Sequence, residues 1–280
     1  MFVLLVLLNS AIFAQPILAP MLSLIPISDA NPTSRFPAVT LFLIALNVIA
    51  FFTTPGLGTS EESNRYFFDR APLACQLEND CPEGVQLSSG PQEIPERDLV
   101  SFMGSVVFST FLHAGFLHII GNMLFLWVFG NNVEDFLGPV KFLLFYLLGG
   151  IIASFAHVWW TISTSGTDCF ADPNACVPSV GASGAVAAVM GAYLLLFPRA
   201  RVNVLVPIFI IFTIIQMSAL TTLLIWFAYQ FVIAWQDVTG VTSVAWMAHV
   251  GGFVFGVVAI FLLGGRPQRP PPVFQPEWRV

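Results

Sequence analysis

A serine at the start of an apolar helical segment is the first residue in this sequence whose type and position could support chemistry. Ser183 follows turn-forming residues at Pro178 and Gly181 and precedes a long apolar run. This pattern predicts a hydroxyl in the first turn of a helix, where unpaired backbone N–H groups and the helix dipole favour negative charge. His249 lies in another apolar segment and could take the proton of Ser183. A serine activated by a histidine base is suited to attack on a peptide bond.

A second pair of polar residues could stabilise the oxyanion that such an attack creates. His118 and Asn122 are four residues apart, so on a helix they lie on one face. Their side chains could donate hydrogen bonds to the oxyanion together with the backbone N–H of Ser183. The predicted membrane spans contain no Asp or Glu in their interiors, so the sequence predicts a Ser183–His249 dyad and no third triad member.

The elements that must position these residues are predicted to be membrane helices. The chain has 280 residues, of which 56% are hydrophobic and only 9% charged. Apolar runs of about 20 residues, the length that crosses a bilayer as a helix, recur along it. We therefore predict an all-α polytopic membrane protein. A net charge of −6 without a basic patch argues against a nucleic-acid partner.

Six spans are predicted, all within the second of three regions of the chain. The spans are about 37–54, 116–131, 139–160, 183–197, 219–235 and 244–263. Residues 99–113 and 204–215 are predicted to be re-entrant or interfacial, the latter because it is short and contains Pro207. The regions are an apolar leader and cytoplasmic approach (1–36), a membrane domain (37–265) and a Pro-rich tail (266–280).

Residues 1–28 leave three interpretations open. They could be an uncleaved leader, an interfacial segment, or an upstream extension before a working start at Met21. No Lys or Arg precedes the apolar run, and Pro16, Pro20 and Pro26 would interrupt a spanning helix. We favour the start at Met21.

The distribution of Lys, Arg and Cys predicts the orientation. Basic residues in the short flanks face the cytoplasm when both termini are cytoplasmic. Cys75, Cys81, Cys169 and Cys176 then all lie in outer loops, as expected of disulfides in an oxidising compartment. Local pairing, Cys75–Cys81 and Cys169–Cys176, is the simplest of three possible connectivities. The spacing of these cysteines argues against a zinc site.

Small residues are predicted to bring the serine and histidine helices together. The helix-packing candidates are Gly181, Gly184 and Gly191 around Ser183, and Gly252 and Gly256 after His249. Glycines let helix backbones approach closely in a membrane. This contact would carry Ser183 up to His249, at a similar depth near the outer ends of their spans.

These motifs resemble the rhomboid intramembrane serine proteases. The resemblance rests on GASGA around Ser183, AHVGG around His249 and the segment FLHAGFLHIIGNMLFLWVFGNNVEDFLG, and it covers about residues 25–265. It implies a six-helix core, Ser183 as nucleophile, His249 as base, and an oxyanion site of His118, Asn122 and the Ser183 N–H. It also implies single-span membrane-protein substrates cut near the outer membrane boundary, and no cofactor or metal. The IPISDANPT segment resembles the bacterial branch, so we expect a bacterial plasma membrane.

Two departures from the family pattern affect these expectations. Residues 99–110 lack the Trp-Arg pair that many members carry in the first loop. The aromatic residue that packs beneath the base in some members is Ala187 here, so the sequence does not show what holds the His249 ring. Other histidines are interpreted as structural: His113 as interfacial and His157 as part of an aromatic belt. The acidic first loop is interpreted mainly as a solvated surface.

Alternative functions are less well supported. A non-catalytic rhomboid-like protein that binds transmembrane clients would typically lack the serine or the histidine, and both are present. A transporter would be expected to show paired intramembrane charges or broken helices in matching halves. A metal-dependent membrane protease would carry an HExxH motif, which is absent. The substrate and the oligomeric state are not predicted.

Overall fold

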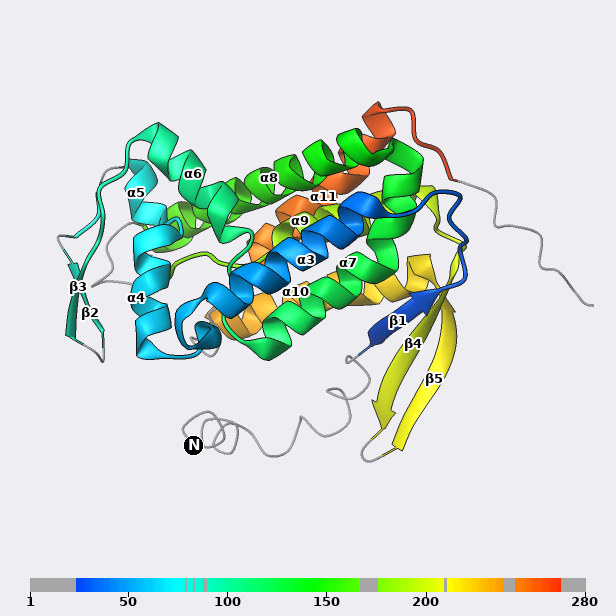
Figure 1. Ribbon diagram of the computed structural model, residues 1–280, viewed down its shortest axis with the longest axis horizontal. Helices are drawn as coiled ribbons and strands as arrows, with labels where there is room; N and C mark the ends of the chain where they lie inside the picture. The colour runs from blue at the N-terminus through cyan, green and yellow to red at the C-terminus, as the bar shows by residue number, and fades with distance from the viewer. Residues whose placement is uncertain are drawn as a thin grey trace, which may run out of the picture.

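The computed structural model describes residues 24–78, 80–82, 84–87, 90–166, 176–208, 211–238 and 245–267. Residues 1–23 of the predicted leader, residues 268–280 of the predicted Pro-rich tail, and Cys169 lie outside them. The described chain is mostly helical but also contains two β-sheets, so the prediction of an all-α fold is correct only in part (Figure 1). Its long helices are α3 (Ala38–Thr53), α7 (Phe116–Leu137), α8 (Pro139–Ser165), α9 (Ser183–Leu196), α10 (Ala219–Val238) and α11 (Trp246–Leu262). Shorter elements are η1 (Pro55–Gly58), α4 (Glu61–Arg70), α5 (Ala74–Glu78), α6 (Leu99–Ser109), β1 (Ile25–Asp29), β2 (Gly84–Leu87), β3 (Gly90–Glu93), β4 (Arg201–Ile208) and β5 (Ile211–Ser218).

The six long helices coincide with the six predicted spans. Among the described residues, however, only α7 and α8 are both long and apolar enough to cross a membrane by length and composition. Helix length therefore supports two of the six predicted crossings. Large apolar side chains such as Trp127, Leu144 and Val254 are exposed on the outer faces of the helices. An apolar outer surface of this kind is expected where helices face lipid.

Helix α9 lies at the centre of the bundle, and this explains its composition. Eleven of its 14 residues are buried, from Gly184 to Leu196. A helix that is apolar on every side is buried on every side. It packs mainly against α11, α8 and α7. Ser183, its first residue, therefore begins the most enclosed element of the protein.

One end of the bundle carries a three-stranded antiparallel sheet in the order β1–β4–β5, and we call it the sheet end (Figure 1). Asp29 pairs with Val202, and Arg201 pairs with Ser218. The segment 204–215 is predicted from sequence to be re-entrant or interfacial; its described residues, 204–208 and 211–215, instead belong to the paired strands β4 and β5. Val202 and Val204 are fully buried at alternate positions, as expected for a strand with one face on a core.

Two carboxylates, the buried Glu134 and the half-buried Asp29, organise the helix ends near this sheet. Glu134 of α7 accepts hydrogen bonds from the backbone N–H groups of Val39 and Thr40, at 2.9 and 2.8 Å, and so satisfies free donors at the start of α3. Asp29 accepts hydrogen bonds from the Tyr193 hydroxyl at 2.5 Å and from Asn132 Nδ2 at 2.9 Å. Asp29 therefore links β1 to both α9 and α7.

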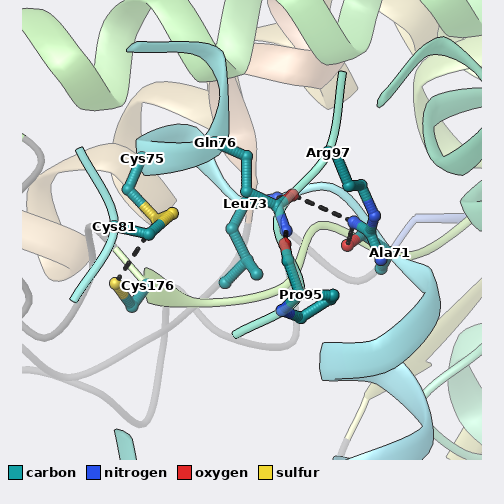
Figure 2. Close-up of a disulfide and its surroundings, with 8 residues drawn as sticks. All are labelled: Ala71, Leu73, Cys75, Gln76, Cys81, Pro95, Arg97 and Cys176. Carbon is teal, nitrogen blue, oxygen red and sulfur yellow. Dashed lines mark hydrogen bonds between the residues drawn. A yellow bond between two sulfur atoms is a disulfide. The ribbon is translucent and has the colours of Figure 1, made fainter. Parts of the chain in front are cut away.

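The opposite end of the bundle carries α4, α5, α6 and the β2–β3 hairpin, and we call it the capped end. A disulfide joins Cys75 to Cys81, which confirms that predicted pair. Cys176 Sγ lies 3.9 Å from Cys75 Sγ (Figure 2). The second predicted pair includes Cys169 and falls outside the described residues.

Arg97 ties the capped end together. Its guanidinium donates to the carbonyl oxygen of Ala71 at 2.7 Å and to Gln76 Oε1 at 2.9 Å (Figure 2). It also donates to the carbonyl oxygen of Asp69 at 2.7 Å. Gln76 Nε2 in turn donates to the carbonyl oxygen of Pro95 at 2.9 Å. The predicted solvated loop is therefore an ordered layer beside the bundle, because the half-buried Arg97 side chain joins three of its segments.

Candidate active site

The contact between α9 and α11 brings Ser183 and His249 to one region. A β-carbon added to Gly252 would lie 2.1 Å from the Gly184 carbonyl oxygen, and one added to Gly256 would lie 1.9 Å from the Ala188 oxygen. One added to Gly191 would lie 2.1 Å from the Phe253 oxygen. No side chain fits at such distances, so these three glycines allow the two backbones to touch.

The other two predicted packing glycines have different roles. Gly184 faces α8, where an added β-carbon would lie 2.5 Å from Ala153 Cβ. Gly181 lies before α9 with a φ of 127°, a conformation that favours glycine. A β-carbon there would lie 2.7 Å from His118 Nε2 and 3.7 Å from Ser183 Oγ. Gly181 is therefore not a helix-packing residue, and its missing side chain leaves room between the imidazole and the hydroxyl.

A cavity of about 570 Å³ contains all four predicted chemical residues in its wall. Ser183 and His249 contribute from α9 and α11, and His118 and Asn122 from α7. The rest of the wall is largely apolar and comes from α4, α7, α8, α9, α10 and the segment 177–180 before Ser183. It includes Phe67, His157, Val180, Met190, Trp226 and Tyr229. The polar groups thus face a common space in an apolar surrounding, where electrostatic interactions are strong.

His118 is arranged to donate a hydrogen bond into this cavity. The backbone N–H of Ala114 donates to His118 Nδ1 at 3.4 Å. A neutral imidazole that accepts at Nδ1 carries its proton on Nε2, the atom beside Gly181 and Ser183. His113 is fully buried and packs edge-on against the His118 ring, with 5.1 Å between ring centroids. His113 therefore supports the orientation of His118.

Asn122 supplies an unused donor. Its side chain is 7% exposed, and Nδ2 has no hydrogen-bond partner in the part of the chain that the structure describes. Buried donors are rarely left unpaired, so such a group in a cavity wall is suited to a ligand or a water. Together with His118 Nε2 and the Ser183 N–H, it gives three donors from two helices.

The His249 ring is held by a residue that sequence reasoning missed. The Trp226 indole of α10 packs against it, with ring centroids 5.9 Å apart at 45°. Ala187, at the position where some family members carry an aromatic residue, is buried within α9. The aromatic support is therefore present, but it comes from a different helix. Only the contact between α10 and α11 could have revealed it.

Two further parts of the wall were also misjudged from sequence. His157, interpreted as part of an aromatic belt, lines the same cavity from α8, and its Nδ1 has no partner within the described residues. A titratable residue inside a predicted span is itself a signal of function. Asn64, Phe67 and Phe68 of α4 also line the cavity, so the first loop is not simply a solvated surface.

Comparison with known families identifies this arrangement. The Rhomboid domain model matches residues 102–266, which contain α7 to α11 and every residue of the predicted dyad and oxyanion site. The chain belongs to the rhomboid family. The resemblance seen in the sequence motifs is therefore confirmed at the level of the family.

Three individual relatives indicate which members of the rhomboid family this chain resembles. The chain is 30% identical over 152 residues to Presenilin-associated rhomboid-like protein A, mitochondrial, of Danio rerio, covering 54% of this chain and 35% of the relative. It is 29% identical over 166 residues to Rhomboid protein 1, mitochondrial, of Saccharomyces cerevisiae, covering 58% and 42%. It is 36% identical over 101 residues to RHOMBOID-like protein 12, mitochondrial, of Arabidopsis thaliana, covering 34% and 30%.

Two consequences follow from these relatives. The chain matches less than half the length of each, so what each whole protein does is not transferred with the match. Their names place them in mitochondria, so the expectation of a bacterial-type member in a bacterial plasma membrane is wrong. The short IPISDANPT segment suggested that branch, but Ile25–Asp29 pairs with β4 as a strand of the sheet, so its composition has a structural cause.

Proposed function

We propose that this rhomboid-family protein is an intramembrane serine endopeptidase that cuts a peptide bond in or beside a substrate's transmembrane helix. The observation that carries the proposal is the shared cavity: a serine, a histidine and two polar donors from three helices face one largely apolar space. A non-catalytic packing role does not require them to converge. In this proposal α3, α7, α8, α9, α10 and α11 all cross the bilayer.

In the proposed mechanism, the Ser183 hydroxyl attacks the scissile carbonyl while His249 takes its proton. The carbonyl oxygen becomes an oxyanion that accepts hydrogen bonds from His118 Nε2, Asn122 Nδ2 and the Ser183 N–H. His249 then returns its proton to the leaving amine, and an acyl-enzyme forms at Ser183. A water molecule, deprotonated by His249, attacks the ester and releases the second product.

The relatives support a location in a mitochondrial membrane, and the substrates would be single-span proteins of that membrane. Detection of the epitope-tagged chain in the carbonate-resistant membrane fraction of purified mitochondria is the expected result. Recovery only in another membrane would contradict this location without bearing on the chemistry.

The chemistry is tested by cleavage of a model single-span substrate in proteoliposomes. We expect the unsubstituted protein to cut, and Ser183→Ala and His249→Ala to be inactive. Ser163→Ala should retain activity, because Ser163 is an exposed residue of α8 whose hydroxyl, among the described residues, donates only to the Trp159 carbonyl oxygen. Equal cleavage by all four would assign the activity to a contaminant.

A fluorophosphonate probe separates a poor substrate from an inactive protein. Labelling that is lost in Ser183→Ala would show an activated serine even if the chosen substrate is not cut. Absence of both cleavage and labelling in a folded protein would contradict the proposal and favour a client-binding rhomboid-like protein.

A further inference from the structure

The β4–β5 hairpin exposes an uncharged, largely apolar surface. No residue from Val202 to Ser218 is charged. Phe212, Ile214 and Ile215 of β5 are 67%, 60% and 41% exposed. Adjacent residues of a strand point to opposite faces, so Ile214 and Ile215 expose apolar surface on both faces of β5. A strand with one face on the core and one in water would instead alternate apolar and polar residues.

The free edge of the sheet is equally unprotected. In the described part of the chain, β5 is the last strand in the order β1–β4–β5. Edge strands in water are usually guarded by charged residues or proline, because they otherwise pair with other chains. Ile211–Ser218 contains neither. The β5 edge is therefore suited to an environment other than bulk water.

The base of the hairpin is fixed at the ends of two helices. The Ala219 N–H donates to the Ala200 carbonyl oxygen at 2.8 Å, and the Leu220 N–H donates to the Pro198 oxygen at 3.0 Å. From this base the two strands extend beside the sheet end of the bundle, at an oblique angle to the long helices (Figure 1). If the helices cross the bilayer, a hairpin at this end lies near one surface of the membrane.

Cationic side chains surround the same end. Arg199 and Arg201 are exposed at the base of the hairpin, and Arg201 Nη1 donates to Gln216 Oε1 at 3.0 Å. Arg35 lies near Gly138, and Lys141 is in the first turn of α8, also at this end. Anionic lipid phosphates would complement these charges. Interfacial membrane anchors combine apolar side chains with nearby Lys and Arg residues, as this hairpin does.

The backbone of β5 limits how deep the hairpin can lie. An unpaired sheet edge exposes N–H and C=O groups that find no partner in the hydrocarbon core, and open edges do not occur there in contact with lipid. At the headgroup level water can satisfy these groups while the side chains reach the acyl chains. The interface is therefore the depth that suits both the edge and its side chains.

We propose that the β4–β5 hairpin is a membrane-interface anchor at the sheet end, with Phe212 and Ile214 entering the acyl boundary and Arg199 and Arg201 contacting lipid phosphates. This role rests on the proposed crossing of the bilayer by the long helices, but not on the proposed proteolysis. The hairpin connects α9 to α10. The anchor would therefore couple the C-terminal end of α9, the helix that begins with Ser183, to the lipid on that side.

The anchor is tested with nitroxide labels in proteoliposomes of phosphatidylcholine and phosphatidylglycerol. Labels are placed by Phe212→Cys and Ile214→Cys, with Gln216→Cys near the base and Glu93→Cys on β3 as an aqueous control. The unsubstituted protein, carried through the same labelling, gives the background. We expect labels at 212 and 214 to be more accessible to oxygen than to a nickel chelate, and the label at 93 to show the reverse.

Three results would overturn the anchor. One is nickel accessibility at 212 and 214 equal to that at 93. Another is dipolar broadening between 212 labels of two molecules, since it would show that a second copy covers the strand. When Arg199 and Arg201 are both replaced by Gln, we expect the label at 212 to become more accessible to the nickel chelate. The third overturning result is a ratio of oxygen to nickel accessibility at 212 that this double replacement leaves unchanged. Circular dichroism and the Glu93 label verify that each variant is folded.

Discussion

The Trp226 indole lies against the His249 imidazole, with 5.9 Å between ring centroids, and the two residues belong to different helices, α10 and α11. The orientation of the proposed base therefore depends on where α10 sits. Ala187 leaves no aromatic support from α9 itself, so Trp226 is the residue that limits rotation of the ring from this side.

Replacing Trp226 by Ala should lower kcat about 10- to 100-fold, because small misplacement of a catalytic group costs rate steeply. Trp226→Phe should recover most of the loss, since a smaller ring still packs against the imidazole. Both are measured as cleavage of a single-span substrate in proteoliposomes, with Trp127→Ala, an exposed residue of α7, as the control. If Trp226→Phe is as impaired as Trp226→Ala, the ring contact does not position His249.

Asn122→Ala should lower kcat about 10²- to 10³-fold with little change in KM, because its amide would act on the transition state and not on the bound substrate. Fluorophosphonate labelling of Ser183 and single-turnover cleavage measure the chemical step directly. A change confined to KM would instead assign Asn122 to substrate binding.

Gly252→Ala should destabilise the protein by several kcal/mol, because the added methyl would lie 2.1 Å from the Gly184 carbonyl oxygen and would force α9 and α11 apart. Gly104→Ala on α6 is the matched control, since nothing lies within 4 Å of the position where its methyl would stand. Thermal unfolding in detergent should show a lower midpoint for the first variant and an unchanged or slightly raised midpoint for the second. Equal midpoints would show that the two helices can separate at little cost.

Asp29 should make stability depend on pH. Burial raises the pKa of Asp29 to about 6, against the lowering effect of the hydrogen bonds from Tyr193 and Asn132. The folded protein then holds this proton more tightly than the unfolded chain, whose carboxyl titrates near pH 4. The contribution of the protonated Asp29 to the free energy of unfolding is therefore full below about pH 4 and is lost as pH rises to about 6. The free energy of unfolding falls across this range by at most about 1.4 kcal/mol per pH unit.

Unfolding measured in detergent between pH 4 and pH 7 tests this dependence on Asp29. Asp29→Asn should flatten the fall in stability across that range, whereas Asp135→Asn, at an exposed carboxylate bonded to Ser34, should not. Parallel curves for the native protein and Asp29→Asn would show that Asp29 does not titrate in this window.

Much of the fold could be predicted because its signals are local. The apolar runs of the six long helices, the turn before Ser183 and the Gly252–Gly256 spacing each act over a few neighbouring residues. The Cys75–Cys81 disulfide also closes a short loop, so sequence proximity was enough to predict it. The proposed oxyanion pair was visible in the same way, because His118 and Asn122 share one face of a single helix.

The sequence by itself determined the helices, the family motifs and the residues able to do chemistry, since periodicity and spacing belong to each segment alone. The tertiary structure decided what surrounds them: Trp226 against His249, His157 and α4 in the cavity wall, and Gly181 beside His118. It also decided that residues 204–208 and 211–215 pair as strands, because β1 supplies the neighbour that β4 needs. These features depend on contacts between distant segments, and no local pattern encodes which segments will meet.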